Sequence, residues 1–245
     1  MTTSPLRKMK VEQHLADPAL KQRYVTTMFD LVAPSYDRFT RWFSYGMDRD
    51  WKAALVSRAC REMNNGSLAI DLACGTGDIA LAVAAGSRAQ VIGVDPSARM
   101  LAIARERGGR VEYLKGDMLA LPVSTGEASV ITAAYGFRNA PDHRAALREV
   151  SRALQPGGVL LVLDFYQPEA VWWRTLFLMY LSAAGALYGW AWHGDPAAYS
   201  YIARSISHYV TASEFGRDLT AAGFSIERVQ RHLGGGICFH VARKR

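Results

Sequence analysis

The segment Ile70-Asp71-Leu72-Ala73-Cys74-Gly75-Thr76-Gly77-Asp78 carries the strongest structural signal in this chain of 245 residues. An apolar run over residues 68–73 predicts a strand, a glycine-rich turn follows it, and the turn opens a predicted helix over residues 78–85. Because glycine has no Cβ, the backbone of such a turn can come close to a ligand. In doubly wound sheets, nucleotides bind at this kind of turn.

Short apolar runs alternate with helical patterns after this turn. Further strands are expected over residues 90–94, 111–115, 128–133 and 159–165, and helices over 98–107 and 141–153. A helix over 213–222 and an antiparallel pair of strands over 224–229 and 237–242 complete the pattern. The alternation favours βαβ units with right-handed crossovers. The expected fold class is α/β, a Rossmann-like, doubly wound, mostly parallel seven-stranded sheet with an antiparallel C-terminal strand and N-terminal helices.

Two regions stand apart from this alternating core. Residues 1–25 are polar and charged and predict a flexible N-terminal arm, so that residues 26–245 form a single domain with N-terminal helices. Residues 171–192 are strongly apolar, and no charge occurs from Leu176 to Trp192. This stretch predicts either a buried helix or helical pair, or an apolar lid or membrane-facing patch. Either way, an apolar helical insertion over about 170–210 is expected to cover a substrate site.

Composition narrows the classes of partner. The net charge is +7, but the basic residues cluster at the two ends of the chain, and no basic stripe interleaved with aromatics predicts nucleic-acid binding. The three cysteines are far apart and lack zinc-ligand spacing, so no metal is expected. The N-terminus carries no apolar signal segment, which favours a cytoplasmic location with reduced thiols.

Acidic residues at the ends of the next two strands suit an adenosyl ligand. Asp95 ends the second strand about 20 residues beyond the glycine-rich turn, where a carboxylate can accept both ribose hydroxyls. Gly116-Asp117-Met118 follows the third strand, where the carboxylate could accept from an adenine amino group and Met118 could pack on the ring. The turn lacks the spacing and the lysine of a phosphate site, and Asp71 beside it suits a cationic ligand.

Residues 70–165 resemble the class I S-adenosylmethionine-dependent methyltransferases. Leu121-Pro122 with the following strand, and Arg152-Ala153-Leu154-Gln155-Pro156-Gly157-Gly158, are similar to conserved segments of that class. The resemblance implies S-adenosylmethionine as the cofactor. The cofactor-binding residues that we expect are Asp71, Ala73, Gly75, Thr76, Gly77, Asp95, Pro96, Met100, Gly116, Asp117, Met118 and Tyr135.

A narrower resemblance extends from about residue 26 to the end of the chain. The segment Met28-Phe29-Asp30-x-Val32-Ala33-Pro34-x-Tyr36-Asp37 resembles the opening signature of the ubiquinone/menaquinone biosynthesis C-methyltransferase family. Other matching segments are Ser44-x-Gly46 with Arg49 and Trp51, Tyr135-Gly136-Phe137-Arg138-Asn139, Tyr199-x-Tyr201-Ile202-x-x-Ser205-Ile206, and Gly235-Gly236-Ile237 with His240. The resemblance implies methylation of a ring carbon of a prenyl quinol. Phe39, Thr40, Asp48 and Val210 depart from the family pattern, so methylation of another small molecule at O, N or C stays open.

The resemblance also suggests catalytic residues. Arg138 is expected to stabilise the oxyanion of a quinol by its charge, Asn139 to orient it, and Tyr36 to contact the substrate or cofactor. Arginine is a poor base because its pKa is above about 12, and His208 is the base that we would test first. The structural alternatives are a salt bridge from Arg138 to Asp142 or Glu149, and a surface position for His208.

The expected partners follow from the apolar nature of such a substrate. Residues 171–192 would shield a prenyl tail or dock the enzyme at the inner face of the membrane, and the basic chain ends would assist at an anionic leaflet. A homodimer stays open. A non-catalytic adenosyl-binding protein is the alternative of a different class, and the complete set of turn, acids and Arg138-Asn139 argues against it.

Overall fold

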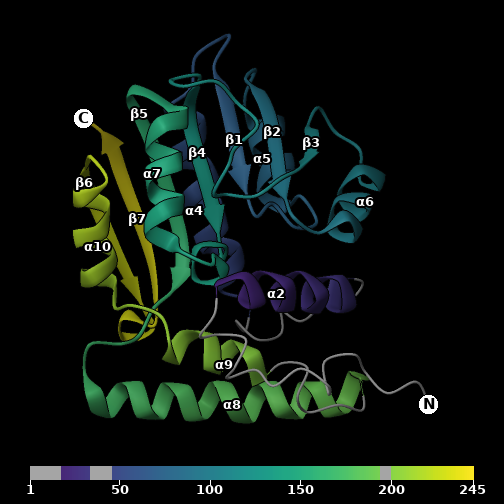
Figure 1. Ribbon diagram of the computed structural model, residues 1–245, viewed down its shortest axis with the longest axis vertical. Coiled ribbons are helices and arrows are strands. Elements are labelled where there is room, and N and C mark those ends of the chain that lie inside the picture. The colour runs from purple at the N-terminus through teal and green to yellow at the C-terminus, as the bar shows by residue number, and fades with distance from the viewer. Residues whose placement is uncertain (1–17, 34–45, 194–199) are drawn as a thin grey trace.

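The computed structural model describes residues 18–33, 46–193 and 200–245, and a seven-stranded sheet in the order β3-β2-β1-β4-β5-β7-β6 forms its centre (Figure 1). The strands are β1 (Leu68–Leu72), β2 (Gln90–Asp95), β3 (Glu112–Lys115), β4 (Ala128–Ala134), β5 (Leu154–Phe165), β6 (Phe224–His232) and β7 (Ile237–Lys244). β1 pairs in parallel with both β2 and β4, whereas β7 lies antiparallel between β5 and β6. The predicted fold class is confirmed, with two antiparallel strands at the C-terminus.

Helices cover both faces of the sheet because its central strands are apolar on both sides. All five residues of β1 are buried. The helices on one face are α4 (Asp48–Arg61), α5 (Asp78–Gly86) and α6 (Ala98–Glu106), and those on the other are α7 (His143–Ala153) and α10 (Ala212–Ala221). The buried residues of α7 are Ala146, Leu147, Val150 and Ala153, which share one face of a helix.

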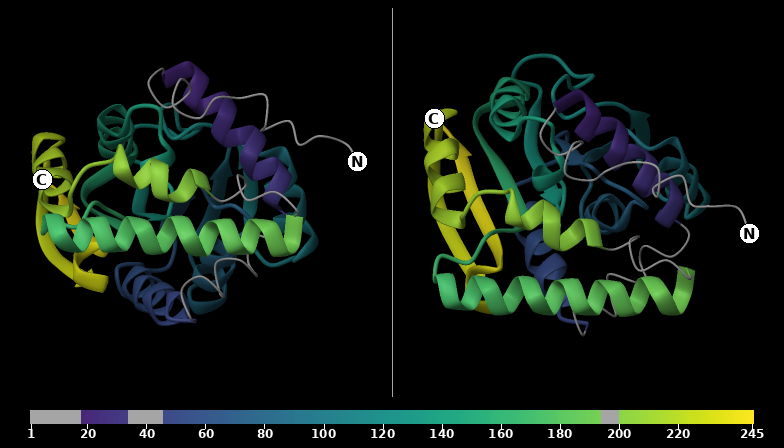
Figure 2. Two further views of the ribbon diagram at one scale, coloured as in Figure 1. Left: turned by 90° about the horizontal axis from the view of Figure 1, so that it is seen from below. Right: turned by 60° about the horizontal axis from the view of Figure 1, so that its bottom comes forward.

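The remaining helices lie beyond the carboxyl ends of the parallel strands (Figures 1 and 2). They are α2 (Pro18–Val32), the short helix η3 (Phe137–Asn139), α8 (Val171–His193) and α9 (Ser200–Ser207), while η5 (Leu233–Gly235) joins β6 to β7. Residues 18–25, which we had predicted as part of a flexible arm, belong to α2, and Tyr24 and Val25 are buried. Tyr36, Phe39 and Thr40 lie outside the described residues.

The apolar stretch forms one helix, α8, and not a helical pair. Phe177, Leu181 and Tyr188 on one face are buried against the core, so the expected buried helix is half correct. The opposite face is exposed and carries the large apolar residues Val171, Trp172, Leu176, Met179, Tyr180, Leu187 and Trp190. Among the helices of the described ranges, none combines the length and the apolarity that crossing a bilayer requires.

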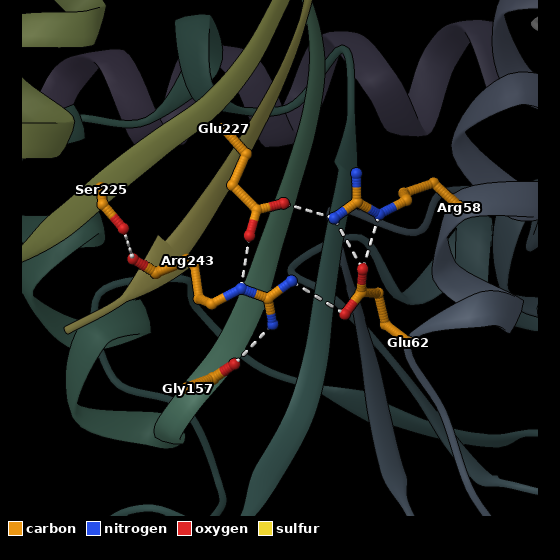
Figure 3. Close-up of polar contacts among 6 residues, drawn as sticks. All are labelled: Arg58, Glu62, Gly157, Ser225, Glu227 and Arg243. Carbon is orange, nitrogen blue, oxygen red and sulfur yellow. Dashed lines mark hydrogen bonds and ion pairs between the residues drawn. The ribbon is translucent and has the colours of Figure 1, made fainter.

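Four charged side chains fasten α4 to the antiparallel edge of the sheet (Figure 3). Arg58 pairs with Glu62 at 2.6 Å and contacts Glu227, and Arg243 contacts Glu227 and pairs with Glu62 at 3.1 Å. Arg243 also donates to the carbonyl oxygen of Gly157 at 2.9 Å, which places the network at the amino end of β5. The network therefore braces the scaffold at the end of the sheet that lies away from the cavity described next.

Candidate active site

A cavity that opens to solvent lies at the carboxyl ends of β1, β2 and β4. Every residue predicted to bind the cofactor lines this cavity except Gly77. α2 supplies a wall that the sequence did not predict, formed by Gln22, Val25, Thr26 and Phe29.

Two residues that line the cavity adopt left-handed backbone conformations without being glycine. Ala73 has φ 50° just after β1, and Tyr135 has φ 62° just after the neighbouring β4. Such conformations are strained by about 1 kcal/mol or more and persist where surrounding contacts fix them. The amide of Tyr135 donates to Leu163 at 2.7 Å, and that of Cys74 donates to Val94 at 3.1 Å. The chain therefore changes direction sharply just after both of these neighbouring strands, where it lines the cavity.

Gly77 lies on the side of the glycine-rich turn that faces Tyr113, and it does not line the cavity. Its φ is +86°, and a Cβ there would collide with the hydroxyl of Tyr113. A Cβ on Gly93 would lie 2.8 Å from Cδ1 of the same ring. The two glycines therefore make room for Tyr113, which packs underneath the glycine-rich turn and supports its shape.

Asp71 ties the turn to its neighbours. One carboxylate oxygen accepts from the Thr132 hydroxyl at 2.7 Å and the other from the amide of Ala80, in the first turn of α5, at 3.1 Å. Burial raises the pKa of Asp71 to about 7, and these two hydrogen bonds oppose the shift. A cationic group in the cavity would favour the ionised form.

Asp95 lies where a ribose is expected. Its two oxygens accept from the amides of Gly75 at 2.9 Å and Ser97 at 2.8 Å. Burial raises its pKa to about 6, while these amides oppose the shift. A carboxylate has about four lone-pair sites, so Asp95 retains capacity for two vicinal hydroxyls.

The charge of the cavity wall suits S-adenosylmethionine. Four carboxylates, those of Asp71, Asp78, Asp95 and Asp117, line it, and Lys52 is the single cation among the described lining residues. Such a wall attracts the sulfonium and the ammonium of the cofactor. Lys52, which pairs with Asp78 at 3.1 Å, is the cation among the described lining residues that could bind the carboxylate of the cofactor. The residues present therefore fit this cofactor.

Asn139 is the predicted catalytic residue that lines the cavity. Its amide nitrogen donates to the carbonyl oxygen of Tyr135 at 3.0 Å, and its amide oxygen accepts from the hydroxyl of Tyr201 at 3.1 Å. Tyr201 is fully buried, so both contacts hold the amide in one orientation. An amide fixed in this way can orient a polar group of an acceptor.

Arg138 lies behind Asn139 and is buried. Its guanidinium donates to Asp164 at 2.9 Å and to the hydroxyl of Ser205 at 3.3 Å, and it lies 5.0 Å from the centre of the Phe165 ring. Burial raises the pKa of Asp164, and the Arg138 charge opposes that shift. The structural alternative, an ion pair of Arg138, is confirmed, but the partner is Asp164 and not Asp142 or Glu149. Asp142 instead caps α7, and Glu149 pairs with Arg152 at 2.7 Å.

The other two predicted catalytic residues receive no support here. His208 is exposed at the end of α9, where its Nδ1 contacts the carbonyl oxygen of Arg204 at 2.9 Å, and it does not line the cavity. We therefore do not carry it forward as a base. Tyr36 lies outside the described residues.

We did not predict that α2 lines the cavity, although its sequence carries a signal for this position. Gln22, Val25, Thr26 and Phe29 are spaced i, i+3, i+4 and i+7, which is one face of a helix. Asp164 had no comparable signal, because a lone acid at the end of an apolar strand does not reveal its partner.

Comparison with known proteins identifies the family. Residues 18–244 match the model of the ubiE/COQ5 methyltransferase family. The demethylmenaquinone methyltransferase of Staphylococcus saprophyticus is 30% identical over 94% of this chain and 100% of its own length. The Thermus thermophilus enzyme of the same name is 37% identical over 81% of this chain and 92% of its own.

Solved structures support the fold. The cyclase SpnF superposes with a TM-score of 0.66 at 21% identity, covering 91% of this chain and 96% of its own. An S-adenosylmethionine-dependent methyltransferase from Mesorhizobium loti superposes with a TM-score of 0.56 at 18% identity, covering 77% of this chain and 96% of its own. The chain therefore belongs to the ubiE/COQ5 methyltransferase family and is an S-adenosylmethionine-dependent methyltransferase.

Proposed function

We propose that this enzyme methylates a ring carbon of a demethylated prenyl quinol in menaquinone or ubiquinone biosynthesis. The observation that carries the proposal is the family match over residues 18–244, which spans the residues that line the cavity and the adjoining Arg138-Asn139 segment. The relatives named demethylmenaquinone methyltransferases favour a naphthoquinol as the acceptor.

The reaction needs few groups from the protein. When bound, S-adenosylmethionine supplies an electrophilic methyl group on a sulfonium. A quinol ring carbon becomes nucleophilic when the neighbouring hydroxyl loses its proton. Attack of that carbon on the methyl group would form the carbon–carbon bond and leave the electron pair of the carbon–sulfur bond on sulfur. The ring carbon would then lose its proton and the oxygen would regain one, so that one proton is released to solvent overall. The protein must hold the two reactants in line and exclude water.

Asn139 is the residue that we assign to the acceptor oxygen. Its amide has two N–H bonds, and within the described residues one of them donates to Tyr135, so the other can donate to an oxygen in the cavity. Arg138 supports this arrangement from behind, because its backbone amide and guanidinium both bind Asp164 and fix η3. Tyr36 remains a predicted substrate contact.

The first experiment follows methyl transfer from labelled S-adenosylmethionine to a short-tailed demethylmenaquinol under reducing conditions. We expect the label on a ring carbon, and Asn139→Ala should lower kcat while affinity for S-adenosylhomocysteine is retained. Label on a hydroxyl oxygen, or cofactor binding without turnover, would overturn the quinol C-methylation and direct the search to other small acceptors.

We further propose that the exposed face of α8 docks on a lipid bilayer. Trp172 and Trp190, 70% and 67% exposed, lie 18 residues apart, which is roughly 27 Å at 1.5 Å per residue. Aromatic residues at both ends of an uncharged helical face are typical of helices that lie in the membrane interface. α8 lies at the cavity end of the sheet, where an acceptor with a prenyl tail would arrive from the membrane (Figure 2).

Flotation with vesicles of phosphatidylcholine and phosphatidylglycerol tests this docking. The wild-type protein should float, the Trp172→Ser/Trp190→Ser variant should not, and Ile226→Ser, an exposed apolar residue on β6, should float like wild type. Ultracentrifugation of the same variants checks whether α8 instead joins two copies. A dimer that the double variant loses, with no flotation of the wild type, would contradict lipid docking.

A further inference from the structure

We infer that Gln22 on α2 takes part in recognising the adenine of the cofactor, together with Asp117. This inference rests on the placement of S-adenosylmethionine in the cavity. It adds a residue from outside the sheet to a site otherwise built from strand ends and the turns that follow them.

The contact between the two side chains carries the inference. The amide nitrogen of Gln22 donates to Oδ2 of Asp117, while Oδ1 of Asp117 accepts from the amide of Leu119 at 2.9 Å. Both side chains line the same cavity, next to Gly116 and Met118. Gln22 and Asp117 therefore form one polar edge where an adenine is expected.

The chemistry of that edge matches an exocyclic amino group. The adenine amino group has two hydrogens to donate, and Asp117 can accept one of them. The amide oxygen of Gln22 is an acceptor beside the same carboxylate, so it can accept the other. On the rest of the inward face of α2, Val25 and Phe29 are apolar, and the Thr26 hydroxyl donates to the carbonyl oxygen of Gln22 at 3.0 Å, whereas the Gln22 side chain is the one that bonds to Asp117.

Two contacts keep α2 in place on either side of Gln22. The ammonium of Lys21 donates to the carbonyl oxygen of Ala140 at 2.6 Å, and the hydroxyl of Ser97 donates to Asp30 at 2.5 Å. Ala140 and Ser97 both line the cavity. Since these anchors do not involve Gln22, its replacement should leave α2 seated.

The experiment measures binding of S-adenosylhomocysteine by calorimetry, with no need for an acceptor or for turnover. Gln22→Ala should weaken binding about fivefold to tenfold, as expected for the loss of one hydrogen bond of about 1 kcal/mol. Thr27→Ala is the matched control, because Thr27 lies on the same helix, its hydroxyl donates to the backbone of Arg23 at 2.8 Å, and it does not line the cavity. It should bind like wild type.

An analogue that lacks the 6-amino group separates recognition from simple support of α2. The 6-deamino analogue should bind wild type more weakly, and Gln22→Ala should then cause no further loss, because the two changes remove the same interaction. Equal losses for both ligands would overturn the inference and leave Gln22 as a support for α2, and so would unchanged binding in Gln22→Ala. Failure of the wild type to bind S-adenosylhomocysteine would instead refute the cofactor placement.

Discussion

Replacement of Asp164 by alanine should destabilise the protein more than any surface charge change. Asp164 is fully buried and accepts three hydrogen bonds, two from Arg138 at 2.9 and 3.1 Å and one from the amide of Phe165 at 2.7 Å. Without it, the contacts that the described residues still offer the buried guanidinium are all to neutral groups: the hydroxyl of Ser205 and the carbonyl of Tyr135, both at 3.3 Å, and the Phe165 ring. A buried charge would thus lose its counterion.

The expected magnitude follows from that loss. Removing one partner of a buried ion pair costs about 3–5 kcal/mol, whereas a domain is typically stable by about 5–15 kcal/mol. With a urea dependence of about 3 kcal/mol per M, the unfolding midpoint should fall by about 1–1.7 M. The control is Arg217→Ala, whose side chain is 73% exposed and lies 3.9 Å from Glu214. It should change the free energy of unfolding by less than about 0.5 kcal/mol.

Urea unfolding followed by circular dichroism measures both variants. The double variant Arg138→Met/Asp164→Leu should recover part of the lost stability, because it removes both charges together. The reasoning is refuted if Asp164→Ala shifts the midpoint no more than Arg217→Ala does, or if the double variant is less stable than the single one. Neither Arg138 nor Asp164 lines the cavity, so affinity for S-adenosylhomocysteine should fall less than turnover in Asp164→Asn.

Three further predictions concern the cavity. Affinity for the cofactor should fall as the pH is lowered from 8 to 5, since protonation of Asp71, whose pKa is raised to about 7, removes a charge that attracts the sulfonium, and protonation of Asp95, whose pKa is raised to about 6, removes an acceptor for the ribose; in calorimetry, the Asp95→Asn variant should lose the lower part of this dependence. Gly77→Ala should destabilise the fold by more than about 1 kcal/mol in thermal unfolding, and Tyr113→Phe should restore part of it by removing the colliding hydroxyl. Lys21→Met should lower turnover more than it weakens S-adenosylhomocysteine binding, since Lys21 also anchors α2, and it should abolish any decline in rate above pH 8.

The alternating core could be predicted from the sequence because its signals are local. Apolar strands, the glycine-rich turn and the acids after β2 and β3 all lie within one continuous stretch, and the parallel topology brings their ends together. The predicted ends of the strands were less accurate. β5 begins at Leu154, earlier than predicted, because Leu154 pairs with Ala128 before an irregularity in the register, and Pro156-Gly157-Gly158 had indicated a turn.

The acceptor side could not be predicted equally well because it depends on contacts between distant segments. The sequence of α2 is polar enough to suggest an arm, yet its inward face closes the cavity against turns that follow much later in the chain. The partner of Arg138 is Asp164, 26 residues away on β5. Asp142 and Glu149 are nearer in sequence but bind other groups. His208 was chosen because it follows a segment that resembles the family, but it lies exposed just after helix α9.

The cavity has to bind a cationic cofactor and also stabilise an oxyanion on the acceptor, and these two tasks require opposite charges. We infer that α2 contributes to both. The cofactor end carries four carboxylates, which suit a cationic sulfonium but would repel an oxyanion on the acceptor. Arg138 cannot offset them fully, because Asp164 neutralises most of its charge. Lys21 donates to the carbonyl oxygen of Ala140, which lines the cavity next to Asn139, and although burial and the nearby Arg138 lower its pKa to about 8, it stays charged near neutral pH. We therefore assign the positive field that favours an acceptor oxyanion to Lys21 as well as Arg138, with the Asn139 amide directed at the oxygen itself. On this proposal, α2 contributes to cofactor binding through Gln22, which lines the cavity, and to the positive field through Lys21, which lies behind the lining residue Ala140.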